Sequence, residues 1–139
     1  MKISIKLLTL IILPMIIFSC SEYSGGWLSE DDIKAGVYRH YEVSPNATPE
    51  DASYIHNIDF MELVKEVDSK GREEQHYWYC MTMTIRYYTY LPEDLGKKVL
   101  VEKTLDKLGV ITAWKRKGEI KASHDLRDTA NHKYRKICE

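Results

Sequence analysis

Cysteine is scarce in this 139-residue chain, and its histidines are scattered. The three cysteines form no Cys-x-x-Cys pair, and the five histidines show no His-x-x-x-His spacing. Both patterns are typical of zinc sites. The chain also lacks a glycine-rich loop between a strand and a helix, which is the usual phosphate-binding signature. The sequence therefore predicts neither a metal nor a cofactor.

Catalytic residue types come together only in Ser123-His124-Asp125. Neighbouring residues of a strand point to opposite faces, so these side chains cannot converge as nucleophile, base and orienting acid. His76, Met81 and Met83 offer ligands for a soft metal. Methionine is more often a filler of apolar cores, and we interpret Met81 and Met83 in that way. We expect a protein without enzymatic activity.

Long apolar runs are absent after residue 19. The one apolar stretch, residues 7–18, follows Lys2 and Lys6 and is interrupted by Pro14. A helix that crosses a bilayer needs about 20 apolar residues, so this stretch is too short. A positive region before a short apolar core is instead typical of a signal peptide.

The end of that stretch, Ile17-Phe18-Ser19-Cys20, resembles the lipobox of bacterial lipoproteins. The resemblance implies cleavage before Cys20, a diacylglyceryl thioether on its sulfur and acylation of the new amino terminus. Several buried acyl chains would provide a lasting membrane anchor. An ordinary secretory peptide, or an apolar helix with an incidental cysteine, is the alternative.

Three parts of the chain follow from this interpretation. Residues 1–19 are expected to be a lipoprotein signal peptide, residues 20–28 the lipidated cysteine with a short tether, and residues 29–139 a single domain. About 120 residues can build one small core, not two. In enterobacterial lipoproteins, an aspartate directly after the lipidated cysteine signals retention in the inner membrane. Ser21 stands at that position here, so the similarity implies the outer membrane, facing the periplasm. A nucleic-acid partner is not expected in that compartment.

Cys80 and Cys138 remain once Cys20 is assigned to lipid. Cysteine pairs in an oxidising compartment tend to form disulfides. We expect a Cys80–Cys138 bond that fixes the carboxyl terminus and contributes about 2–4 kcal/mol. Two buried free thiols are the alternative.

Charge is distributed unevenly along the chain. Residues 20–74 hold 13 acidic and 5 basic side chains, whereas residues 75–139 hold 8 acidic and 13 basic ones. Two halves that face each other in one fold would explain this asymmetry.

Within the basic half, an aromatic residue and a basic triplet lie together at an expected turn. They are Trp114, Lys115, Arg116 and Lys117, and they form the candidate contact surface. Anionic lipid headgroups would attract such a turn, and a protein or glycan partner is as suitable. A solvated hairpin tip is the alternative.

Local patterns predict one helix followed by strands. Ser29, with Asp32 three residues later, forms a capping box before a helix over residues 30–41. Residues 76–90 are rich in aromatic and β-branched side chains and make the clearest strand, whose face from Tyr77 to Tyr87 is expected to be core. Further strands are expected at residues 55–67 (or a helix there), 98–105 (or a helix over residues 93–108), 110–114, 119–124 and 132–138.

The expected fold class is α+β, with one amino-terminal helix packed on an antiparallel sheet of about five strands. This element order is similar to cystatin-like and nuclear-transport-factor-like domains, which carry many functions. The first functional hypothesis is an envelope lipoprotein that binds a protein partner as an accessory factor. The second is a ligand-binding or inhibitor module, with a cleft between helix and sheet lined by some of Tyr38, Tyr41, Tyr79 and Tyr87.

Overall fold

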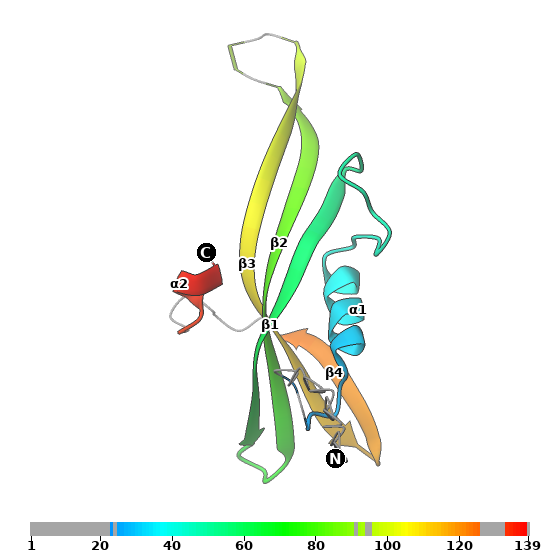
Figure 1. The fold of residues 1–139 in the computed structure, drawn as a ribbon, viewed down its shortest axis with the longest axis vertical. Coiled ribbons are helices and arrows are strands. Elements are labelled where there is room, and N and C mark those ends of the chain that lie inside the picture. The colour runs from blue at the N-terminus through cyan, green and yellow to red at the C-terminus, as the bar shows by residue number, and fades with distance from the viewer. Residues whose placement is uncertain (1–22, 24, 91, 94–95, 126–132, 139) are drawn as a thin grey trace, which may run out of the picture.

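Four strands form one antiparallel sheet in sequential order. The computed structural model describes Tyr23 and residues 25–90, 92–93, 96–125 and 133–138. The strands are β1 (Ser53–Val67), β2 (Glu73–Tyr90), β3 (Lys98–Arg116) and β4 (Glu119–Asp125). Helix α1 (Glu30–His40) lies on one side of the sheet, and the single-turn α2 (Arg135–Cys138) lies on the other (Figure 1). The α+β expectation of a helix on an antiparallel sheet is confirmed, with four strands instead of five.

The strand count differs because β3 is longer than expected. The segments 98–105 and 110–114 belong to one strand, which pairs without a break with β2 from Lys98 to Trp114. Lys103 and Lys107, which interrupt the apolar pattern, are exposed. They lie where β3 is an edge strand, because β4 pairs with β3 only from Val110 onward. Polar residues are suited to such an edge, and they mark no turn.

The prediction of a carboxyl-terminal strand at residues 132–138 is wrong for the part of this segment that the structure describes. Residues 135–138 form α2 instead. Cys80 lies in β2, and both edges of β2 are already paired, with β1 and with β3. The chain can therefore reach Cys80 only across a face of the sheet, where a strand would find no backbone partners.

Helix α1 and strand β1 form where the sequence predicts them. Ser29 and Asp32 make a reciprocal capping box, and Ile33 and Val37 are fully buried. Strand β1 contains two register shifts, at Ile55/Asn57 and Phe60/Glu62, which explain its broken alternation. Each shift moves the following side chains to the other face.

The sheet has a large apolar cluster under α1 and a smaller one on the opposite face. The first is built around Tyr77, Tyr79, Met81 and Met83, together with Ile33 and Val37. The second holds Trp78, Cys80, Leu108 and Val110. The predicted core face of β2 is confirmed from Tyr77 to Met83, and Ile85 is partly buried, but the prediction is wrong for Tyr87, which is 45% exposed because it lies beyond the end of β1.

The packed structure begins earlier than the sequence suggests. Tyr23, expected in the tether, is only 3% exposed, and its ring lies against Phe60 and Tyr77. Trp27 and Leu28 are also packed against the apolar cluster under α1. Tyr23 and residues 25–28 thus belong to the domain, because their aromatic and aliphatic side chains cover the sheet.

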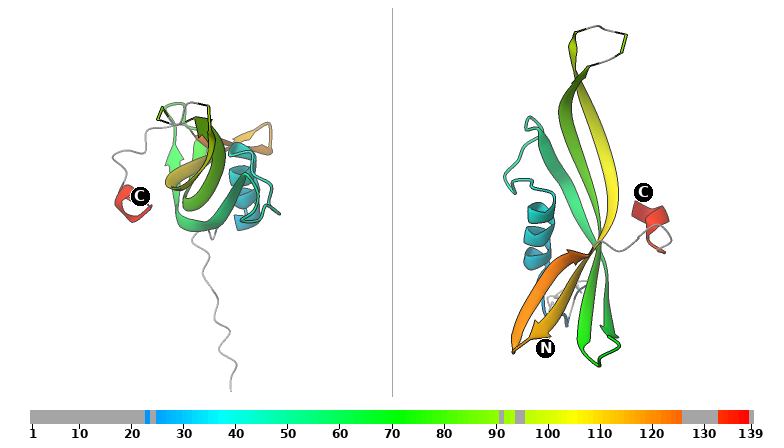
Figure 2. Two further views of the ribbon diagram at one scale, coloured as in Figure 1. Left: turned by 90° about the horizontal axis from the view of Figure 1, so that it is seen from above. Right: turned by 180° about the vertical axis from the view of Figure 1, so that it is seen from behind.

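The β2–β3 hairpin extends well beyond the rest of the sheet. Strand β1 ends its pairing at Ser53 with Ile85, whereas β2 and β3 continue to Tyr90 and Lys98. We call residues 86–90 and 98–102 the arm. Figures 1 and 2 show it projecting from one end of the molecule, opposite the end that holds the β1–β2 and β3–β4 turns.

Candidate functional site

The candidate contact surface lies on the β3–β4 hairpin, whose residues 114–121 we call the basic hairpin. Arg116 pairs with Glu119, which leaves a two-residue loop. Lys117 and Gly118 both have positive φ, 52° and 78°. A two-residue hairpin of this kind needs left-handed backbone at both loop positions, and it matches the twist of the strands. The turn is therefore tight and presents its basic side chains in a defined place.

The structure brings the four predicted surface residues to one end of the sheet. Lys115, Arg116 and Lys117 are exposed, and Trp114 is half-buried. The Lys115 Nζ lies 4.8 Å from the centroid of the Trp27 ring. The adjacent Glu119 is paired with Lys121, with 2.8 Å between carboxylate and ammonium. The hairpin thus keeps a positive surface, with its one acidic side chain neutralised.

A cleft of about 570 Å³ opens beside the basic hairpin. Trp114 and Lys115 line it, together with Arg72 from the β1–β2 turn. Asp68 holds Arg72, with 2.6 Å between Oδ2 and Nε. Hydrogen bonds from the backbone and side chain of Arg72 lower the pKa of Asp68. The remaining wall is polar and includes Thr112, Ser123 and Asp125.

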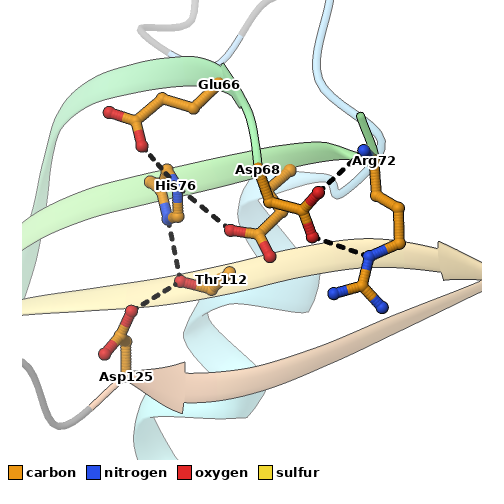
Figure 3. Close-up of polar contacts among 7 residues, drawn as sticks. Glu66, Asp68, Arg72, His76, Thr112 and Asp125 are labelled. Carbon is orange, nitrogen blue, oxygen red and sulfur yellow. Dashed lines mark hydrogen bonds and ion pairs between the residues drawn. The ribbon is translucent and has the colours of Figure 1, made fainter. Parts of the chain in front are cut away.

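Next to this cleft, polar side chains from all four strands form a row across the sheet (Figure 3). Glu66 of β1 lies 3.2 Å from Nε2 of His76 on β2. The Nδ1 of His76 is 2.9 Å from the hydroxyl of Thr112 on β3, and that hydroxyl donates to Asp125 on β4 at 2.9 Å. The row thereby connects all four strands through side chains that are far apart in sequence.

The direction of these hydrogen bonds follows from Asp125. A carboxylate can only accept, so the single hydroxyl hydrogen of Thr112 goes to Asp125. The Thr112 oxygen then accepts from Nδ1–H of His76, which assigns a hydrogen to that nitrogen. The His76 side chain is 1% exposed. Because solvent does not reach the imidazole, we interpret the row as a structural clamp. No residue spacing in the sequence indicates this row, since its side chains meet only through strand pairing.

The side chains of His124 and Asp125 contact opposite faces, as predicted. Asp125 accepts from Thr112, whereas His124 lies on the α1 side, stacked on His40 with 3.5 Å between ring centroids. The Tyr79 hydroxyl is hydrogen-bonded to Nε2 of His124. Burial and the neighbouring His40 lower the pKa of His124 to about 4. The imidazole is therefore neutral near pH 7.

A second cleft, of about 500 Å³, lies between α1 and β4. Its wall includes Ala35, Gly36, Arg39 and His40 of the helix, with Ile111 of the sheet. The tyrosines expected to line a cleft between helix and sheet do not line this one. Tyr79 is fully buried beneath it, and Tyr38 and Tyr41 pack against the apolar cluster.

The arm carries exposed aromatic side chains, among them Tyr87, which was expected on the core face and is 45% exposed. Tyr88 is 69% exposed, Tyr90 61% and Leu100 53%. Tyr88 pairs with Leu100 across the two strands, so both lie on one face. The sequence signal for the arm is that the strand expected at residues 76–90 is longer than the strand expected beside it at residues 55–67. The exposure of individual side chains does not follow from this difference, because it depends on the strand register.

The Cys80–Cys138 disulfide is present, with 5.4 Å between Cα atoms. It holds α2 against the smaller apolar cluster. Tyr134 also packs there, and its hydroxyl donates to Glu62. The predicted pairing is confirmed. Cys20, the predicted lipidation site, lies outside the described residues.

Within the described ranges, no three histidine, cysteine, aspartate or glutamate side chains are grouped to hold a metal ion. In the same part of the chain, no helix combines the length and the apolar character needed to cross a bilayer. Comparisons with protein-family models, with curated proteins and with solved structures found no match.

Proposed function

We propose that this chain is a lipid-anchored lipoprotein of the bacterial envelope that binds a protein partner, without catalysis, through the face of the arm formed by Tyr88, Tyr90 and Leu100. The exposure of these three side chains is the observation that carries the proposal. Tyrosine is favoured at protein contacts because its ring is apolar and its hydroxyl can hydrogen-bond. We place the protein on the outer membrane, facing the periplasm.

The arm's shape supports a binding role. A two-stranded ribbon with few packed neighbours is marginal in water, so such an extension is costly unless something uses it. Its base is held in place by Arg86, which forms an ion pair with Glu102 at 2.7 Å and donates a hydrogen bond to the carbonyl of Pro49. A fixed base reduces the ordering that binding would require.

The proposed anchor complements the arm. The lipobox-like segment ends at Cys20, only three residues before the packed Tyr23. A membrane-held domain searches for its partner in two dimensions, which raises the partner's effective concentration. A modest aromatic surface then suffices for association.

Photo-crosslinking in cells tests the partner surface. A photoreactive phenylalanine analogue replaces Tyr88 in one variant and Val67 in another. Val67 is equally exposed, at 69%, but lies at the other end of the sheet. We expect a discrete protein adduct from position 88 and none from position 67.

A second substitution separates specific contact from proximity. Leu100→Ser removes an apolar side chain beside Tyr88 and should lower the adduct yield about tenfold, as expected for a central interface residue. Val67→Ser, at an exposed residue of β1 at the other end of the sheet, is the matched control and should leave the yield unchanged. Equal yields in both variants, or no adduct at position 88, would contradict the proposal.

The second candidate function, a ligand-binding module, is favoured by the cleft between α1 and β4. Its mouth combines Arg39 and His40 with the apolar Ile111. Native mass spectrometry of the protein isolated from envelopes would show a bound small molecule. Ala35→Phe, at an exposed position of the wall, should displace that molecule, and a mass unchanged from the bare chain would remove this candidate.

A further inference from the structure

The amino-terminal segment enters the fold at the end that holds the basic hairpin. Gly25 accepts a hydrogen bond from Lys65 of β1 at 3.2 Å, and the backbone of Trp27 donates to Gln75 of β2 at 2.8 Å. Lys115 of β3 lies over the Trp27 ring. Residues 25–27 thus cross three strands, within a few residues of both turns.

Charge differs between the parts of this end. On the β1–β2 turn, Asp68 is paired with Arg72, and on the basic hairpin Glu119 is paired with Lys121. Arg116 and Lys117 are exposed and form no ion pair with any acidic side chain in the described ranges. The acidic first turn of α1 lies further from this end. The backbone N–H of Leu28 donates to the hydroxyl of Tyr77, two residues further along β2 than Gln75, so the chain has already left the end before the helix begins.

Two half-buried tryptophans accompany the basic side chains. Trp27 and Trp114 lie at this end, whereas Trp78 is buried at 5% exposure. Tryptophan is enriched at the level of lipid headgroups, where one part of the ring is apolar and the other can hydrogen-bond. Basic and indole side chains on one tip match the chemistry of an anionic membrane surface.

We infer that the basic hairpin docks on the anionic leaflet to which the chain is anchored, through Lys115, Arg116, Lys117 and the two tryptophans. The inference rests on the proposed lipidation of Cys20. Three residues span at most about 11 Å, so a lipid on Cys20 would keep Tyr23 close to the headgroups. Screening extends over about 8 Å at physiological ionic strength, so the hairpin would meet the surface charge once this end of the sheet faces the lipid.

Docking at this end directs the arm away from the membrane. The strand from Gln75 to Tyr90 measures about 50 Å at roughly 3.3 Å per residue. Figure 2 shows the arm and the basic hairpin at opposite ends of the long axis. The proposed partner surface would therefore stand clear of the lipid.

The experiment uses the mature lipidated chain in vesicles that contain phosphatidylglycerol with brominated acyl chains. Bromine quenches nearby indoles, so Trp27 and Trp114 report contact of the basic end. Quenching should be strong, and it should fall at least twofold in vesicles of brominated phosphatidylcholine alone. An indole placed on the arm by Tyr88→Trp should add emission that the bromine leaves unquenched.

A matched pair of charge variants tests the role of the hairpin. The hairpin variant carries three substitutions, Lys115→Glu, Arg116→Glu and Lys117→Glu. Each lost cation should lower partition to an anionic surface about fivefold, so the variant should show at most half of the quenching. The control changes Lys98, Lys103 and Lys107 of β3 to glutamate and should leave quenching unchanged. Equal loss in both variants, or quenching of the arm indole, would overturn the inference.

Absence of the proposed lipid on Cys20 can be distinguished from failure of the hairpin to dock. Mass spectrometry of the same preparation shows whether Cys20 carries lipid, which tests the proposed function. If Cys20 is bare, sedimentation of the chain with phosphatidylglycerol vesicles still measures docking. Loss of sedimentation in the hairpin variant but not in the β3 control supports the hairpin surface, whereas equal sedimentation of all three chains overturns it.

Discussion

At the residue scale, Tyr79, His124 and His40 form the contact between the sheet and α1. The hydroxyl of the buried Tyr79 is hydrogen-bonded to Nε2 of His124, and His40 stacks on the face of that imidazole. Burial and the neighbouring Tyr41 raise the pKa of Tyr79, so it remains neutral. Protonation of His124 would place a charge in a partly buried site, against His40.

This contact predicts that stability falls in mild acid. The pKa of His124 is about 4 in the folded chain, below the usual 6.5. The unfolded chain therefore binds more protons between pH 6.5 and pH 4, and stability decreases as pH falls through that window. Since His124 is partly exposed, we expect a loss of only about 1–2 kcal/mol, measured as a lowered melting temperature.

Two further measurements check this pH dependence. His40→Leu removes a like charge from the stack and should move the His124 midpoint, followed by NMR, toward 6.5. Asp32 and Asp68 do not obscure the window, because hydrogen bonds lower their pKa from 3.8 and their contribution is lost at more acidic pH. A His124 midpoint of 6.5 in the unaltered chain would contradict the prediction.

A second prediction concerns Gly109, which faces Tyr79 across the β2–β3 pair. A Cβ at this position would lie 2.3 Å from the Tyr79 hydroxyl and ring. Gly109→Ala should therefore cost about 2–3 kcal/mol of unfolding free energy in chemical denaturation. In a Tyr79→Leu background the same change should cost much less, because the ring is gone. Equal costs in the two backgrounds would show that the ring is not the cause.

At the scale of elements, α2 is too short to be stable alone and depends on its attachments. The disulfide joins Cys138 to β2, Tyr134 packs against the smaller apolar cluster, and Glu62 binds both Tyr134 and Lys133. A helix of one turn gains little from its own hydrogen bonds. The carboxyl terminus is thus held by side-chain chemistry.

Removal of the disulfide should destabilise the domain and release α2. We expect Cys80→Ser with Cys138→Ser to lower the free energy of unfolding by about 2–4 kcal/mol. Hydrogen exchange should rise at Leu108 and Val110, which α2 helps to cover. Tyr134→Phe keeps the bridge and loses one hydrogen bond, so its cost should be about 1 kcal/mol. A double serine variant as stable as the parent would refute this account of α2.

At the scale of the whole molecule, the two ends of the sheet differ in chemistry. One end collects the amino-terminal segment and the basic hairpin, and the other carries the tyrosines of the arm (Figure 1). Because one long hairpin, β2–β3, passes through both ends, their separation is set by strand length. A partner at the arm and a membrane at the basic hairpin would not compete for space.

The proposed anchor gives a prediction for the intact protein in cells. Cys20→Ala should abolish incorporation of labelled palmitate and move the chain out of the membrane fraction, because the thioether forms on that sulfur. Cys138→Ala is the matched control, since it removes a cysteine but leaves the anchor. Membrane partition and labelling that persist in Cys20→Ala would end the lipoprotein interpretation.

Much of the local structure was predictable from the sequence. The capping box at Ser29, the spacing of Ile33 and Val37 and the core face of β2 from Tyr77 to Met83 depend on nearby residues only, and all are confirmed. The sequence divides the strand at residues 98–116 because exposed lysines at a sheet edge interrupt the apolar alternation. The carboxyl-terminal helix was missed because the pairing of both β2 edges depends on the entire topology.

The candidate surfaces show the same division. The sequence placed Trp114, Lys115, Arg116 and Lys117 on a turn, and its cysteine count paired Cys80 with Cys138. Only strand register showed that residues 25–27 cross the sheet beside that turn, that His76 meets Asp125 through Thr112, and that Tyr88 and Leu100 lie beyond β1. Periodicity and capping act within a few residues, whereas register, burial and the ends of a sheet arise from contacts between segments that the chain separates widely.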